Sequence, residues 1–229
     1  MQYYYSSEKG IHHIINEDYL FEKVTDDFAV FAVADGVGGL AHGDIASKFA
    51  VKPFTRLSIP PPFLEPLFQE ANKCILSESE KQKCMMASTL VGAVLDIKAN
   101  KVTIAHVGDS RAYLFSNDGI WHTKDDTLVQ ELVDMGIVNE HQAFDHPDKN
   151  RLNKALGVCE KITVQTYTTT ITGPFTLLLC SDGLHDYVRD EDIKSILMRK
   201  RPKLAIEHLV RKARDNGSTD DITIIIMKN

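Results

Sequence analysis

The chain has 229 residues with a formal net charge of −6, and 43% of its residues are hydrophobic. This length and composition exclude wholesale disorder and allow a full hydrophobic core without disulfides or a structural metal. The net negative charge argues against nucleic acid or an anionic membrane as the main partner.

The four cysteines form no C-x-x-C pair, which predicts buried thiols in a reducing compartment. The N-terminus lacks the basic start and apolar run of a signal peptide. No stretch approaches the roughly 20 apolar residues of a spanning helix. We therefore expect a cytoplasmic protein without a membrane anchor.

The first elements of the chain are a strand and two helices. Phe28–Ala34 is a nearly continuous apolar run that ends at Asp35-Gly36, which is typical of a buried strand. Apolar residues at helical spacing predict a helix from 43 to 57, which Pro53 should kink or end early. Pro60-Pro61-Pro62 breaks the chain and opens a second helix.

Three strand candidates follow, and hairpin-type connections at Ala99-Asn100 and Asn117-Asp118-Gly119 predict that they form an antiparallel block. These candidates are Thr89–Ile97, Lys101–Val107 and Arg111–Phe115. The predicted helices of the second half are Leu128–Ile137, Asp190–Met198 and Pro202–Asp215, and the predicted strands are Lys161–Thr172, Phe175–Cys180 and Ile222–Met227. Clustered strands with helices in separate pairs favour an α+β fold of antiparallel sheets covered by helices, in one domain over 1–229.

Acidic residues recur at the ends of the predicted strands. They are Glu17 and Asp18 before Tyr19-Leu20-Phe21, Asp35 after Phe28–Ala34, Asp182 after Phe175–Ser181, and Asp220 and Asp221 before Ile222–Met227. A single Asp-Gly is more often an ordinary turn. If these acids converge, however, cations must offset their repulsion, and oxygen ligands select Mg²⁺ or Mn²⁺ over zinc. The spacing alone leaves their convergence open.

Six motifs supply a resemblance that covers the chain essentially from end to end. In order they are Asn16-Glu17-Asp18, Ala34-Asp35-Gly36-Val37-Gly38-Gly39, Ala87-Ser88-Thr89-Leu90, His106-Val107-Gly108-Asp109-Ser110-Arg111, Cys180-Ser181-Asp182-Gly183-Leu184 and Thr219-Asp220-Asp221-Ile222-Thr223. Their order resembles the type 2C metal-dependent protein serine/threonine phosphatases (the PPM family), in the compact bacterial form. The resemblance implies a four-layer αββα sandwich of two antiparallel sheets with a two-metal site at one end.

The resemblance also implies a role for each acid. Asp35 would bridge both ions. Asp182 and Asp220 would bind the first ion, and the Gly36 carbonyl and Glu17 would bind the second. Asp125 would bind a third, weaker ion. Asp18 would orient a metal-bound water. Asp221 stands where the family often has Asn, and we rank it below Asp220.

Three departures from the family pattern concern substrate and proton handling. His13 stands where the family usually has a phosphate-binding Arg, so phosphate affinity should fall or depend on pH, unless Lys9 or His12 compensates. An ordinary turn histidine is the alternative. Val37 and Leu40 replace histidines found in relatives, which leaves His42 as a candidate general acid, against a merely solvated loop histidine.

The third departure is Asp126, which replaces a common His. We expect Arg111 and His185 to be structural. The segment of about 126–155 resembles the family's variable flap beside the active site, where substrates would be selected, with an ordinary surface excursion as the alternative.

The leading hypothesis is a Mg²⁺- or Mn²⁺-dependent phosphatase with two or three ions. It would hydrolyse phosphoserine and phosphothreonine in proteins by direct attack of a metal-bridging water, as a monomer that opposes a partner kinase. One alternative is a catalytically weak phosphoprotein-binding module of the same fold, motivated by His13. The other is a phosphatase of small molecules.

Overall fold

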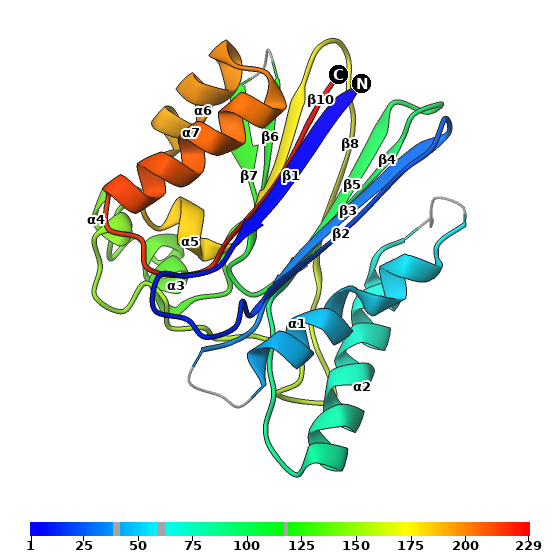
Figure 1. Ribbon diagram of the computed structural model, residues 1–229, viewed down its shortest axis with the longest axis vertical. Helices are drawn as coiled ribbons and strands as arrows, with labels where there is room; N and C mark the ends of the chain where they lie inside the picture. The colour runs from blue at the N-terminus through cyan, green and yellow to red at the C-terminus, as the bar shows by residue number, and fades with distance from the viewer. Residues whose placement is uncertain (39–41, 59–62, 117–118) are drawn as a thin grey trace.

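In the computed structural model, which describes residues 1–38, 42–58, 63–116 and 119–229, two five-stranded sheets pack face to face with helices outside (Figure 1). Sheet A has the order β1-β10-β9-β6-β7 and sheet B the order β2-β3-β4-β5-β8. All neighbouring strands are antiparallel. The predicted α+β sandwich of four layers is confirmed.

The strands of sheet A are β1 (Gln2–Glu8), β6 (Arg111–Ser116), β7 (Gly119–His122), β9 (Thr176–Cys180) and β10 (Ile222–Lys228). Those of sheet B are β2 (Asp18–Val24), β3 (Phe28–Asp35), β4 (Leu90–Asp96), β5 (Lys101–Val107) and β8 (Gln165–Thr170). The helices are α1 (Gly43–Val51), the 3-10 helix η1 (Lys52–Arg56), α2 (Glu65–Gln82), α3 (Leu128–Asp134), α4 (Glu140–Phe144), α5 (Asp182–His185), α6 (Asp190–Arg199) and α7 (Pro202–Asp215). None of the described helices has the length and apolar character needed to span a membrane.

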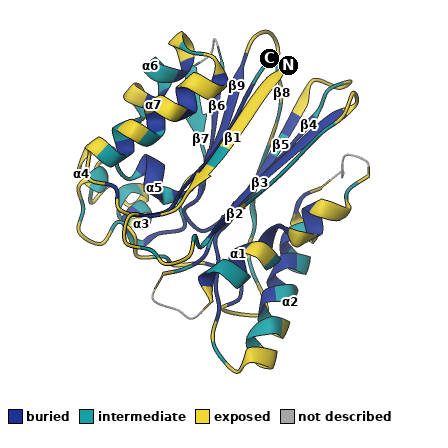
Figure 2. Cartoon of the chain, in the orientation of Figure 1, coloured by how far each residue is buried: buried dark blue, intermediate teal, exposed yellow. Residues whose placement is uncertain are grey.

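Three apolar layers hold the sandwich together, and β3 shows how one strand serves two of them. Its residues alternate between the faces of sheet B: Phe31 and Val33 pack between the sheets, whereas Val30 and Ala32 pack under α1 and α2. A strand covered on both faces reads as a continuous apolar run rather than an alternating one. A third layer lies between sheet A and helices α5, α6 and α7. Figure 2 shows the buried strands between helices whose outer faces are exposed.

The helix predicted over 43–57 ends early, as Pro53 requires. Helix α1 stops at Val51 and continues as η1, in which Pro53 occupies one of the first two positions. The helix expected to open at Pro60-Pro61-Pro62 is α2, but these prolines lie outside the described residues.

The predicted antiparallel block around residue 110 is wrong in part. Strands β4 and β5 do pair, but β6 belongs to sheet A and pairs with β9 and β7. The chain therefore crosses between sheets at Gly108-Asp109-Ser110, where Gly108 has a φ of +98°. Hairpin signals are local, whereas the choice between the two sheets is made by pairing with β8 and β9, which lie far along the chain.

Three strands were not predicted as such. Strand β1 reads Gln-Tyr-Tyr-Tyr-Ser-Ser-Glu, which has no apolar alternation, and it lies exposed at the edge of sheet A. Strand β7 has only four residues, and β2 alternates weakly. Strand β8 is also shorter than the predicted 161–172.

Candidate metal centre

The acidic strand ends meet at one end of the sandwich, opposite the two chain termini (Figure 1). Asp18 opens β2 and Asp35 closes β3, and the two residues face each other in the antiparallel register. Asp182 follows β9 after one residue, and Asp220 stands two residues before β10. Because antiparallel neighbours begin and end at the same edge, the topology brings together residues from both halves of the sequence.

A cavity of about 350 Å³ lies between these strand ends. It is lined by six acids: Glu17, Asp35, Asp109, Asp182, Asp220 and Asp221. His13, Gly36 and Val37 complete part of its wall. The structure therefore brings together all the sequence-predicted carboxylate ligands except Asp125, with Asp18 directly beside them.

Burial and crowding disfavour the charged form of several carboxyl groups at this end of the sandwich. Burial, reinforced by the neighbouring carboxylates, raises the pKa of Asp35 and of Asp182 well above the ordinary value. The same causes raise the pKa of Asp18 to about 7 and that of Asp109 to about 8. Bound divalent cations would remove this penalty, because they favour the charged form of each carboxyl group.

Two buried oxygens in this region have no protein partner. Oδ1 of Asp18 and Oδ1 of Asp182 are fully buried and accept no hydrogen bond from the described residues. Buried polar atoms without partners are rare in folded proteins. Together with the all-oxygen donor set, these orphaned atoms fit hard cations such as Mn²⁺ or Mg²⁺.

Three glycines make this crowding possible. A Cβ on Gly36 would lie 2.3 Å from the carbonyl oxygen of Gly43, and one on Gly43 would lie 2.9 Å from the carboxyl carbon of Glu17. A Cβ on Gly183 would lie 2.0 Å from the carbonyl oxygen of Asp221. Only glycine permits such close approach of one backbone to another. The positions of Glu17, Asp182 and Asp220 therefore depend on these glycines.

Asp18 is held by a hydroxyl group that is itself fixed. The Ser181 hydroxyl donates to Oδ2 of Asp18 at 2.7 Å and accepts from the backbone N–H of Thr223 at 3.0 Å. The Asp18 side chain thus has one anchored oxygen and one free oxygen.

Asp221 ties the N-terminal segment to the start of β10. Its oxygens accept hydrogen bonds from the backbone N–H of Gly10 at 2.6 Å and of Glu17 at 2.7 Å. It also lies 3.1 Å from Nδ1 of His13, whose Nε2 is 3.7 Å from Asp220. This buried aspartate is therefore a structural anchor, and its oxygens are largely engaged.

His13 lies at the mouth of the cavity among carboxylates. Burial acts to lower its pKa, but the contacts with Asp221, Asp220 and Glu17 raise the pKa above its ordinary value. Ligand atoms of His13, Asp220 and Asp221 all lie within 4.8 Å of one another. The imidazole thus lines the cavity next to the carboxylates of Asp220 and Asp221.

Two other sequence-predicted residues lie outside the cavity lining. Both oxygens of Asp125 accept from the Arg111 guanidinium, at 2.8 and 2.7 Å, and this pair lines a neighbouring pocket of about 470 Å³. The ion pair lowers the pKa of Asp125 against the effect of its burial. His42 is exposed at the start of α1, in the left-handed conformation with φ 62°. Leu40 lies outside the described residues.

Sequence reasoning missed Asp109, Asn150 and Leu152, which also line the cavity. Asp109 carried a usable signal, since it follows the buried strand β5 closely in the sequence Gly-Asp-Ser, as the other acids flank their strands. Asn150 and Leu152 lie in an irregular segment that carries no comparable pattern.

An αββα sandwich with an oxygen-lined acidic cavity at one end matches the class of protein that the six motifs resemble. The family model described as protein phosphatase 2C matches residues 10–213. The chain is 37% identical to the serine/threonine phosphatase stp of Listeria innocua, over 95% of this chain and 90% of that protein. The chain therefore belongs to the protein phosphatase 2C family.

Solved structures agree with this assignment. The serine/threonine phosphatase Stp1 from Staphylococcus aureus superposes with a TM-score of 0.90 at 28% identity, covering 98% of this chain and 93% of that one. The catalytic domain of the phosphatase PstP, in complex with two manganese ions, gives a TM-score of 0.84 at 28% identity over 98% and 96% of the two chains. The protein is a metal-dependent serine/threonine protein phosphatase.

Proposed function

We propose that this chain hydrolyses phosphoserine and phosphothreonine esters of proteins by direct attack of water, without a phosphoenzyme. The observation that carries the proposal is the set of buried carboxylates around one cavity, with the partnerless oxygens of Asp18 and Asp182. Among the described residues no cysteine lines the cavity and His13 is its one histidine, so neither a cysteinyl-phosphate nor a second imidazole is at hand.

The residues that would hold two cations are oxygen donors on four segments. Asp182 and Asp220 would hold the first ion, Glu17 and the Gly36 carbonyl the second, and Asp35 would serve both. For a third, weaker ion we assign Asp109 in place of Asp125. Asp109 lines the cavity, whereas both oxygens of Asp125 are engaged by Arg111. When bound, Mn²⁺ or Mg²⁺ would acidify water and neutralise charge on the phosphoryl group.

The chain's own side chains position the reactants. Asp18, anchored through Oδ2 by Ser181, would accept a hydrogen bond from the attacking water at its free Oδ1. His13, which lines the cavity, would donate a hydrogen bond to a phosphoryl oxygen of the substrate. We keep His42, an exposed imidazole four residues after the cavity residue Gly38, as the proposed proton donor to the leaving seryl or threonyl oxygen.

The biological setting belongs to the same proposal. A phosphatase of this specificity would act on phosphorylated proteins, including a cognate serine/threonine kinase or its targets. We further propose that residues 1–229 form one catalytic domain, which works as a monomer in the cytoplasm.

Turnover of p-nitrophenyl phosphate and of a phosphothreonine peptide, after EDTA treatment and after addition of Mn²⁺, tests the proposal. We expect turnover only with Mn²⁺, and Asp35→Asn should reduce it at least about 100-fold with an unchanged circular dichroism spectrum. Metal-independent or absent turnover would favour the phosphoprotein-binding module. Nucleotides or sugar phosphates turned over faster than phosphopeptides would favour the small-molecule phosphatase.

A further inference from the structure

A second, apolar pocket adjoins the acidic cavity. It has a volume of about 310 Å³ and shares two wall residues with the cavity, Val37 and Leu152. The wall between the two is therefore one side chain thick at these positions. A peptide whose phosphorylated residue occupied the cavity would pass this pocket within a few residues, because an extended chain advances about 3.3 Å per residue.

The floor of the pocket is made of buried apolar side chains. Ala87 and Val107 are 1% exposed and Ala155 is 7% exposed. The backbone beneath them is fixed, because Ser88 and Leu156 exchange N–H···O hydrogen bonds of 3.1 and 2.9 Å. The pocket is thus preformed and does not need a substrate to shape it.

The rim of the pocket combines exposed apolar atoms with a neutralised charge. Val158 is 54% exposed, and Cys159 is exposed beside it. The ammonium group of Lys154 donates to Oδ1 of the buried Asp126 at 2.6 Å. This ion pair offsets the charge of Lys154, and the exposed Lys161 is the other cation of the lining.

We propose that this pocket, the apolar subsite, binds an apolar side chain that flanks the phosphorylated residue of the substrate. The occupant is a leucine-sized or phenylalanine-sized side chain, since a preformed concave site with an apolar floor and a volume of about 310 Å³ suits such a group. The assignment of a substrate side chain to the apolar subsite rests on the proposed phosphatase function, because the subsite adjoins the acidic cavity.

The subsite predicts sequence preference in phosphopeptides but none in small substrates. A set of phosphothreonine peptides carries Leu, Phe, Ala or Asp in turn at each of the three positions on either side. We expect kcat/KM to be about tenfold higher for Leu or Phe than for Ala at one of these positions, since about half of such a side chain's surface would be buried. Val158→Asp should reduce this ratio to about one or two and leave p-nitrophenyl phosphate turnover unchanged.

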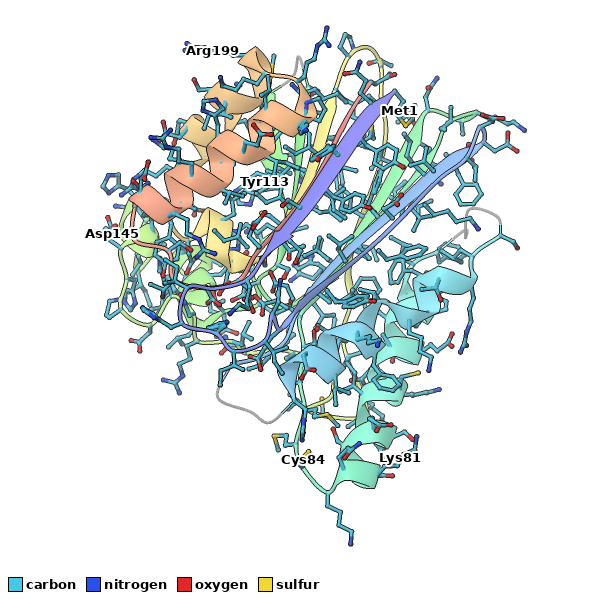
Figure 3. All side chains as sticks on the ribbon, viewed as in Figure 1. Met1, Lys81, Cys84, Tyr113, Asp145 and Arg199 are labelled. Atoms are coloured by element: carbon cyan, nitrogen blue, oxygen red, sulfur yellow. The ribbon has the colours of Figure 1, made fainter. Side chains whose placement is uncertain are left out.

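Met198→Asp is the matched control. Met198 is 67% exposed on α6, and its neighbour Arg199 is labelled in the upper part of Figure 3, the end at which Met1 also lies. This variant introduces the same charge on an exposed apolar position and should keep the tenfold ratio.

Alkylation gives a second, independent measurement. Alkylation of Cys159 by N-ethylmaleimide should abolish the sequence preference. A peptide with Leu at the preferred position should slow this alkylation. In Cys159→Ser, the sequence preference should be insensitive to N-ethylmaleimide. If all wild-type ratios lie near one, or if Val158→Asp leaves the preference intact, the subsite is refuted while the phosphatase function stands. Failure of the wild type to hydrolyse p-nitrophenyl phosphate with Mn²⁺ would overturn the proposed function, and the subsite with it.

Discussion

Asp109 offers the sharpest test of the electrostatics of the cavity. Burial and the nearby Asp125 and Asp186 raise its pKa from 3.8 to about 8. The folded protein therefore holds this proton to higher pH than the unfolded chain does. The stability that the proton confers is complete below about pH 4 and is lost as the pH rises through 8.

The magnitude follows from the two pKa values of Asp109. Between pH 5 and pH 8 the unfolded carboxyl is already ionised, while the folded one is not until the end of the range. Linkage then gives a contribution from Asp109 of about 4 kcal/mol to the loss in free energy of unfolding of the metal-free protein. For a chain of this size that is a fall in Tm of about 10 °C.

Thermal melts in EDTA at pH 5 and pH 8 measure this loss. Asp109→Asn cannot ionise, so between pH 5 and pH 8 its Tm should fall by about 10 °C less than that of the wild type. Asp26→Asn, at an exposed turn position, is the matched control and should follow the wild type. Adding Mn²⁺ should raise the Tm of the wild type more at pH 8 than at pH 5, because metal binding must displace fewer protons there. Parallel pH dependence in Asp109→Asn and the wild type would refute the reasoning.

Two further variants test the packing and the substrate contact. Gly183→Ala should lower the free energy of unfolding by about 3 kcal/mol in urea denaturation and impair turnover, because the new Cβ meets the Asp221 carbonyl oxygen at 2.0 Å. Gly38→Ala, where a Cβ meets none of the described residues within 4 Å, is its control, and equal stability of the two would contradict the argument. His13→Arg should lower KM for a phosphothreonine peptide, since guanidinium binds phosphate through two hydrogen bonds. An unchanged KM would speak against His13 as a phosphate contact.

The elements with strong periodicity could be predicted from the sequence. Residues 202–215 form the predicted helix, and 101–107 form the predicted strand, because each has one clear apolar pattern. The edge strand β1 could not be predicted, since an exposed strand held mainly by backbone hydrogen bonds to β10 needs no apolar pattern. The switch of β6 to the other sheet likewise depends on a partner about 65 residues away, which no local signal reveals.

The candidate site likewise contains residues that the sequence could identify and residues that it could not. Asp35 and Asp182 were identifiable because each ends an apolar run, and the family resemblance supplied their convergence. Asp109 fits the same strand-end pattern, but its place in a short turn suggested structure rather than a ligand. The engagement of Asp125 by Arg111 joins a loop residue to the first residue of β6, which spacing cannot show.

Asn72, a buried residue of α2, links the outermost layer of the molecule to the rim of the proposed apolar subsite. Its side-chain amide donates to the carbonyl oxygens of Cys159 and Glu160, at 2.8 and 3.3 Å, and accepts from the N–H of Gly157 at 2.7 Å. The loop that carries the subsite rim is thus hydrogen-bonded to α2, which covers the face of sheet B that points away from sheet A. Substitutions in α2 would therefore alter the proposed subsite, and with it the preference among phosphoproteins, without changing the ion-binding carboxylates.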